Sequence, residues 1–446
     1  MSAPARGIGG VTHALSRHRN LREATLAAGL ATVAVVLAEV LLGTAGDVPA
    51  HLYRTALAER GVLVWDGFWY GGHDPFAGYS LLYYFLPVLV GHAAVTSASC
   101  IASAALFGSI AVRAWGPAGR WPAWVFSLLA PAPLAFGQWP YALGLAMLLG
   151  GLCALQAGRT WMTLLFAGLA LAASPLAFSF LLIALAAVFA ARPAVTRKML
   201  GLSGGLAVLA GLGLVLDAGF GGGVQDFSGP ELTRLLLLCV LGAALGLARE
   251  YNFIPFFFLL WAAAGLIAFA VDNPMGHNVT RMRFLIVPLV LAAAIRARFR
   301  PRLLAAAALI AAFVYAAVPY ASVIHDATKV PDHGEAAWAP ALEFLRARPS
   351  REFRVEVVPT AAHWEAWYLP RAGFVLARGW HRPLDRERNS ALYKQTITSS
   401  AYEMWLRTNA ARYVVLPPFR LDFEAADAEA KLLRSGSSGL TLLYER

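Results

Sequence analysis

Eleven apolar runs constrain the fold of this 446-residue chain more than any other feature of its sequence. An apolar run of about 20 residues crosses a bilayer as an α-helix, because a helix satisfies its own backbone hydrogen bonds in lipid. Only 14% of the residues are charged, against roughly 25% in an average soluble domain. We therefore predict a polytopic α-helical membrane protein with about eleven transmembrane helices, near 24–43, 96–114, 122–137, 140–157, 160–173, 175–191, 199–217, 231–248, 252–271, 283–295 and 303–323.

The distribution of Lys and Arg predicts the orientation of these spans. With the N-terminus in the cytoplasm, the inner loops carry fifteen basic residues, and the outer loops before the tail carry five. This is the bias of the positive-inside rule. Joining 160–191 into one span would move the cluster Arg296–Arg302 outside, so we divide that run at Ser174-Pro175. The alternative is that two errors in the span count compensate. The topology accounts for most of the net charge of +11, which therefore does not indicate nucleic-acid binding.

The composition changes near residue 324, where the apolar runs end. The tail carries 17 of the 37 Lys and Arg residues. It alternates strand-like runs at 353–358, 373–377, 412–416 and 440–444 with helical patterns at 335–347, 401–409 and 423–435. We predict a transmembrane domain over 1–323 and a small extracytoplasmic α/β domain over 324–446. Residues 44–95 form the first outer loop, with juxtamembrane helices that include 81–93.

The start of this outer loop holds a candidate general base. Asp47 lies just beyond the first span, where partial desolvation of a carboxylate suits acid–base chemistry. Pro49 also makes Asp47 a candidate N-cap of a helix that begins near Val48. In that helix His51 and Arg54 lie on one face, so Asp47, His51 and Arg54 are predicted to point at one pocket.

A second cluster in the loop combines aromatic rings with acids and a histidine. Rings of this kind stack on sugars, and carboxylates bind sugar hydroxyls. The alternative is an interfacial aromatic belt with ordinary turns. The candidate sugar-binding residues are Trp65, Asp66, Trp69, Tyr70, His73 and Asp74.

Arg281 and Arg283 are the main basic pair near the membrane in the predicted outer loops. An arginine can hold a phosphate through two parallel hydrogen bonds, so this pair is a candidate site for a lipid phosphate, with His277 as a candidate partner. The alternatives are arginines that extend to the interface and a histidine in an exposed turn. Gln138 and Trp139, at another predicted outer turn, are candidates to line the same cavity. The sequence contains no zinc-site, catalytic-triad or phosphate-loop pattern.

The order of these features resembles the GT-C superfamily of integral membrane glycosyltransferases. The run GDVPAHLYRTALAERGVLVWDGFWYGGHDPFAGYSLLYYFLP is similar to the first outer loop of bacterial members. The run RGWHRPLDRERNSALYKQTITSSAYEMWLRTNAARYVVLP is similar to the tails of actinobacterial membrane proteins with that loop. The resemblance implies a multi-pass enzyme of the bacterial plasma membrane. It would transfer a sugar from a polyprenyl-phosphate donor to a glycan or glycolipid acceptor of the cell envelope, with Asp47 as general base.

The sequence departs from that superfamily in one respect that bears on the chemistry. Members often carry paired acids in this loop, whereas Val48 follows Asp47 here, so Asp47 acts alone or with Asp66 or Asp74. Many members bind a divalent metal, but this loop offers only single candidate ligands, and no metal ligand is assigned. One alternative function is a non-catalytic membrane protein that binds lipid or glycan during envelope assembly. A transporter is the other alternative.

Overall fold

A computed structural model describes residues 7–42, 46–76, 79–192, 194–220, 223–247, 253–329 and 334–445, with the side chains of 7–17, 319–320 and 322–329 left aside. The chain divides into two compact units. The first, here the helical unit, comprises Met1–Gly43, Val90–Val215 and Asp226–Val323. The second, here the loop–tail unit, comprises Thr44–Leu89, Leu216–Gln225 and Ile324–Arg446. Residues from the predicted first outer loop and the predicted tail thus belong to one compact unit.

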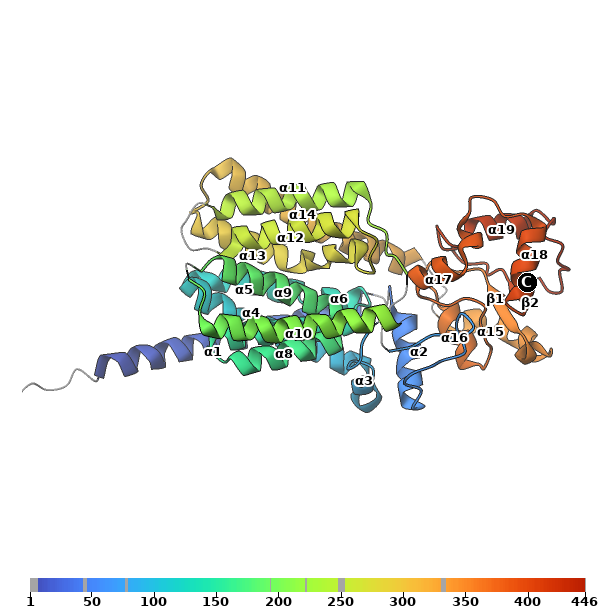
Figure 1. Ribbon diagram of the computed structural model, residues 1–446, viewed down its shortest axis with the longest axis horizontal. Coiled ribbons are helices and arrows are strands. Elements are labelled where there is room, and N and C mark those ends of the chain that lie inside the picture. Colours follow the sequence, from blue (N-terminus) through green and yellow to red (C-terminus); the bar gives the residue numbers. More distant parts are fainter. Residues whose placement is uncertain are drawn as a thin grey trace, which may run out of the picture. The chain divides into compact units, whose positions relative to one another are not determined.

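The helical unit is built from long apolar helices, which run roughly side by side in Figure 1. Their bounds are α1 (Gly7–Leu41), α4 (His92–Trp115), α5 (Arg120–Leu129), α6 (Ala132–Ala135), α7 (Trp139–Gln156), α8 (Thr160–Ala173), α9 (Pro175–Ala190), α10 (Arg197–Phe220), α11 (Gly229–Gly246), α12 (Phe253–Ala270), α13 (Arg283–Arg296) and α14 (Arg302–Lys329). Two 3₁₀ turns, Gly116–Gly119 and Gly276–Met282, precede α5 and α13.

Seven stretches of the described residues are long and apolar enough to cross a membrane. One of them, His92–Ala135, contains both α4 and α5, and three further apolar helices are shorter, at Thr160–Ala173, Pro175–Ala190 and Arg302–Val318. The predicted helical character is confirmed, and these stretches are consistent with the predicted polytopic membrane protein. The predicted break at Ser174-Pro175 is also present, because Ser174 is extended and its hydroxyl accepts a hydrogen bond from the Ala177 amide at the start of α9.

Small residues allow the helices of this unit to approach closely. A side chain added at Gly144 of α7 would lie 2.7 Å from the Cβ atoms of Ser174 and Ala177, and one added at Gly242 of α11 would meet the ring of Phe258. Close packing of this kind drives helix association in lipid, where burial of apolar surface contributes little. Trp261 of α12 is fully buried, and its indole nitrogen donates to the Val279 carbonyl in the turn before α13.

In the loop–tail unit, the loop begins with α2 (Val48–Glu59) and ends with the short helix α3 (Phe85–Val90). The helix predicted over 81–93 is therefore shorter than expected and stops at Gly91, whose φ of 83° ends it before α4. Between α2 and α3 the chain forms a tight reversal, in which Asp66 and His73 exchange backbone hydrogen bonds of 3.0 Å.

The tail folds around a two-stranded parallel sheet of β1 (Arg354–Val357) and β2 (Ala411–Val415). These strands confirm the predictions at 353–358 and 412–416. The segment 375–377 pairs with β1 through Val355, and the amide of Leu376 donates to the carbonyl of Phe68 in the loop. The helices of the tail are α15 (Glu335–Arg346), α16 (Glu365–Arg371), α17 (Arg382–Arg388), α18 (Ser399–Thr408) and α19 (Asp427–Arg434). The run predicted as a strand at 440–444 has no regular structure.

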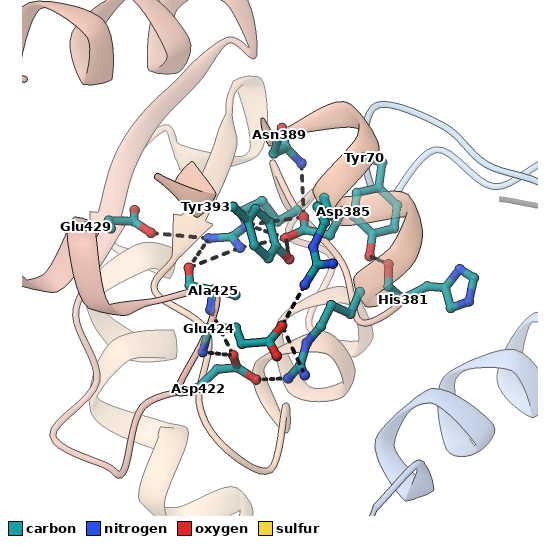
Figure 2. Close-up of polar contacts among 12 residues, drawn as sticks. Tyr70, His381, Asp385, Asn389, Tyr393, Asp422, Glu424, Ala425 and Glu429 are labelled. Carbon is teal, nitrogen blue, oxygen red and sulfur yellow. Dashed lines mark hydrogen bonds and ion pairs between the residues drawn. The ribbon is translucent and has the colours of Figure 1, made fainter. Parts of the chain in front are cut away.

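A buried arginine links several of these tail segments. The guanidinium of Arg378 lies 2.6 Å from Asp385, 3.3 Å from Glu429 and 3.5 Å from Glu356, and it also donates to the Ala425 carbonyl. Asp385 in turn accepts from Asn389 and Tyr393 (Figure 2). One guanidinium faces three carboxylates, and burial with the neighbouring negative charge of Glu429 raises the pKa of Glu356 well above its usual value. The shift favours the protonated form of Glu356, which limits the buried negative charge.

We expect Arg378→Met to lower the free energy of unfolding of the loop–tail unit by about 3–5 kcal/mol, because it leaves buried carboxylates without a cation. The control is Arg407→Met, which breaks the exposed pair of Arg407 and Glu403 and should cost less than about 1 kcal/mol. The stability of both variants is measured by unfolding the full chain with denaturant in detergent, with the susceptibility of the tail to proteolysis as the readout of unfolding. Equal stability of the two variants would contradict the role given to Arg378.

A second charged group joins two other tail segments at His363, which adopts a φ of +54°. Its Nδ1 lies 3.1 Å from Glu365 and its Nε2 lies 3.2 Å from Asp422. Burial acts against the charged imidazolium, but the hydrogen bonds to Asp422 and Glu365 outweigh it and raise the pKa of His363 to about 9. His363 is therefore a cation at neutral pH that holds both carboxylates.

This contact predicts a pH dependence of stability. The folded pKa of about 9 exceeds the ordinary 6.5, so the stabilisation is complete below pH 6.5 and is lost as the pH rises through 9. The loss amounts to about 3 kcal/mol. The measurement is the difference between wild type and His363→Gln, which separates this contribution from that of other titrating groups. We expect that difference in unfolding free energy to shrink between pH 6.5 and 9, and a difference that stays constant over this range would contradict the role given to His363.

Candidate functional site

Asp47 directly precedes α2, at the position of the N-cap, but its side chain makes no capping hydrogen bond. Instead its carboxylate accepts a hydrogen bond of 2.8 Å from the hydroxyl of Tyr79. The side chain of Asp47 is half-buried, so it is partly desolvated and still reachable from solvent. A carboxylate in this setting can accept a proton from a bound hydroxyl.

Tyr79 brings the three predicted pocket residues together. The His51 ring centroid lies 5.3 Å from that of Tyr79, and the Arg54 guanidinium carbon lies 4.8 Å from the Tyr79 centroid. His51 also lies 3.0 Å from the hydroxyl of Tyr84. The structure thus gathers Asp47, His51 and Arg54 around one phenol ring, in agreement with the spacing on α2.

The tail contributes to the same group of residues, here called the Asp47 cluster: Asp47, His51, Arg54, Tyr79, Tyr84, Trp380 and His381. The Trp380 ring meets Tyr79 edge-on at 6.3 Å and stacks on His381 at 6.0 Å. Burial and the nearby charge of Arg54 lower the pKa of His381 to about 3, so this imidazole is neutral. Trp380 is half-buried, and Tyr79 connects it to Asp47, because Tyr79 contacts the Trp380 ring and donates to the Asp47 carboxylate.

Arg54 adds positive charge to the Asp47 cluster. It is buried, and no ion pair joins it to a carboxylate among the described residues. Its Nε atom has no hydrogen-bond partner within the same part of the chain. A buried cation without a salt bridge favours a negatively charged ligand nearby.

Several of the predicted sugar-binding residues lie in the interior of the loop–tail unit. Trp69 is fully buried, with Tyr53 stacked at 4.5 Å and His73 at 5.2 Å, and its indole nitrogen donates to the Ala366 carbonyl. The Tyr70 hydroxyl donates to the carbonyl of His381. Neither ring presents an open face in this structure, so both hold the loop against the tail.

Asp66 and His73 are buried beside Trp69. The Tyr53 hydroxyl donates to Asp66 at 2.7 Å, while His73 Nδ1 lies 3.5 Å from the same carboxylate. Burial raises the pKa of Asp66 and lowers the pKa of His73 to about 3, which keeps His73 neutral. Trp65 is more than half exposed and Asp74 is half-buried, so these two of the six predicted sugar-binding residues are accessible to solvent. The sugar-binding roles of all six residues stay predictions.

The arginine pair predicted near the membrane lines a cavity of about 120 Å³ inside the helical unit. Arg283 is the first residue of α13, and its Nε donates to the Thr280 carbonyl at 3.1 Å while Nη2 contacts the Thr280 hydroxyl. His277 is held by the Asp226 carbonyl. The lining residues of this cavity, here called the arginine cavity, are Phe136, Gln138, His277, Thr280, Arg281, Arg283 and Phe284. Two arginines and no carboxylate favour an anion in it.

A divalent metal does not fit the described residues. No group of three or more His, Cys, Asp or Glu side chains in that part of the chain is arranged to hold a metal ion. The carboxylate of Asp47 accepts a hydrogen bond from a phenol, whereas magnesium is usually held by carboxylates and water. No step of the chemistry below is therefore assigned to a metal.

Four residues of the Asp47 cluster were outside the sequence prediction: Tyr79, Tyr84, Trp380 and His381. Tyr79 lies 32 residues from Asp47, and no local spacing links the two. Trp380 stands in an aromatic and basic run of the tail that gives no sign of which loop residue it meets.

No protein-family model matches this chain, and no curated protein matches it.

A glycine of the tail determines how closely the loop packs. A Cβ atom at Gly379 would lie 2.8 Å from Trp69 Cγ and from Tyr70 Cε2. We expect Gly379→Ala to destabilise the loop–tail unit by about 1–3 kcal/mol, because the two buried rings must shift. The control is Gly67→Ala in the same loop, where a Cβ atom has open space. Tryptophan fluorescence during urea unfolding measures both, and a neutral Gly379→Ala would refute the proposed packing constraint.

Proposed function

We propose that this protein is a membrane glycosyltransferase of the GT-C type. It would transfer a sugar from a polyprenyl-phosphate donor to a glycan or glycolipid of the cell envelope on the outer face of a bacterial plasma membrane. The observation that carries the proposal is the environment of Asp47: a half-buried carboxylate that does not cap its helix and lies among Tyr79, His51 and Arg54. Carboxylates held this way serve as general bases.

In this proposal Asp47 takes the proton of the acceptor hydroxyl. The acceptor oxygen forms a bond to the anomeric carbon while the bond from that carbon to the phosphate oxygen breaks, and the electron pair leaves with the phosphate. The configuration at the anomeric carbon is inverted. Tyr79 orients the carboxylate through its hydrogen bond, which fixes the direction of the basic oxygen.

The arginine cavity is assigned the phosphate of a lipid donor. Arg283 is fixed by Thr280, so its planar group is oriented before a ligand arrives, and Arg281 adds a second positive charge. Fixed cations stabilise the negative charge that grows on a leaving phosphate. Each of these two assignments rests on the contacts within its own unit.

The eleven-span topology is part of the proposal. The seven long apolar stretches, the three shorter apolar helices and the division of His92–Ala135 into α4 and α5 are compatible with that count. An odd number of crossings with a cytoplasmic N-terminus leaves Asp47 and the tail outside. Cysteine labelling with a membrane-impermeant reagent at residues 59 and 403 tests the outer location of both segments.

The decisive test of the chemistry is Asp47→Asn. Loss of a general base lowers the rate by about 10²–10⁴-fold, so the variant should transfer sugar at least about 100-fold more slowly than wild type. The matched control is Glu59→Gln, an exposed carboxylate at the other end of α2, which should retain full activity. The assay uses purified protein in nanodiscs with radiolabelled polyprenyl-phosphate hexoses and pentoses and an envelope lipid extract.

Two results would count against the proposal. If Asp47→Asn transfers sugar as fast as wild type, Asp47 is not the base. If wild type consumes none of these donors, the alternative of a non-catalytic protein that binds lipid or glycan in envelope assembly takes precedence.

A further inference from the structure

The arginine cavity contains one uncharged polar group whose bonding is incomplete. Gln138 lines the cavity, and its side-chain oxygen Oε1 is buried without a hydrogen-bond partner among the described residues. Gln138 is the N-cap residue of α7, yet its side chain makes no capping hydrogen bond. Gln138 Oε1 therefore accepts a hydrogen bond neither from its own helix nor from any neighbour that the structure describes.

The surroundings of Gln138 are positive. The cavity is lined by Arg281 and Arg283 and by no carboxylate. The helix α7 begins at the cavity, at Trp139, and has no side-chain cap. The amino ends of helices carry partial positive charge, which adds to the attraction for an anion.

A carbonyl oxygen cannot itself bind an anion, because both are hydrogen-bond acceptors. Gln138 Oε1 therefore needs a donor, and Arg283, whose Nε and Nη2 contact Thr280, does not donate to it. A ligand that satisfies both the arginines and Gln138 combines an anionic group with a hydroxyl group beside it. The cavity volume of about 120 Å³ far exceeds the roughly 10–15 Å³ that one water requires, so a polyatomic group fits.

We propose that Gln138 is a specificity-determining residue of the arginine cavity, whose side-chain carbonyl accepts a hydrogen bond from a sugar hydroxyl next to the phosphate bound by Arg281 and Arg283. This inference rests on the proposed function, because it takes the anion to be a phosphate. It adds that the cavity distinguishes a glycosyl phosphate from a phosphate ester without a neighbouring hydroxyl. A donor that has lost its sugar would then bind less tightly than the intact donor.

The test compares two soluble probes, glucose 1-phosphate and methyl phosphate, by titration calorimetry on the full-length protein in nanodiscs. Wild type should bind glucose 1-phosphate about tenfold more tightly than methyl phosphate, the value of one added hydrogen bond. Gln138→Met removes the acceptor and keeps the side-chain length, so it should reduce this ratio to about one while methyl phosphate binds as before. Gln156→Met, at the other end of α7, should leave the ratio unchanged.

A second variant guards against a loss of folding. Gln138→Glu keeps an acceptor at the same place but adds a negative charge, so both probes should bind more weakly while the ratio is retained. The inference is overturned if wild type binds the two probes equally, or if Gln138→Met retains the tenfold preference. Binding of neither probe by wild type would overturn the inference together with the phosphate site of the proposed function. Binding of methyl phosphate alone would leave that phosphate site intact.

Discussion

The contact of the loop with the tail, centred on Trp69, determines where the functional candidates of the loop–tail unit lie. The indole stacks with the rings of Tyr53 and His73 and donates to the Ala366 carbonyl of the tail. Around it, Leu376 donates to the Phe68 carbonyl. Burial of a large aromatic side chain stabilises a fold by several kcal/mol when compared with its truncation to alanine, roughly 3–5. This contact therefore fixes the loop that carries Asp47.

The same packing divides the loop residues by role. Asp66, Trp69, Tyr70 and His73 are structural in their contacts, whereas Asp47, Trp65 and Asp74 retain access to solvent. The buried residues share a chemistry with the accessible ones, since both sets contain acids and aromatic rings. The two sets differ in burial. The carboxylate of Asp66 accepts from Tyr53 in the interior, whereas the carboxylate of Asp47 accepts from Tyr79 and is only half-buried.

Much of the helical unit could be predicted because its signal is local. An apolar run of sufficient length must be helical in lipid, and Ser174-Pro175 marks the end of one helix and the start of the next. The strands β1 and β2 were predictable from short β-branched runs. The long-range contacts were not, because Tyr79 with Asp47 and Tyr79 with Trp380 depend on the packing of separate segments. The arginine cavity was partly predictable, since the predicted topology assigns the turns at 138 and 281 to the same side of the membrane.

The discontinuous composition of the loop–tail unit has a consequence for biosynthesis. Thr44–Leu89 emerges from the ribosome early, whereas Ile324–Arg446, which covers Trp69 and bonds to Phe68, emerges much later. Domains generally fold as units during synthesis. The loop–tail unit therefore cannot complete its folding until the apolar helices between its two main segments have been synthesised. Until then the aromatic residues of the loop, Trp69 among them, lack the tail residues that bury them. A chain that terminates early would thus be exposed to quality-control proteases through its first loop, far from the site of the truncation.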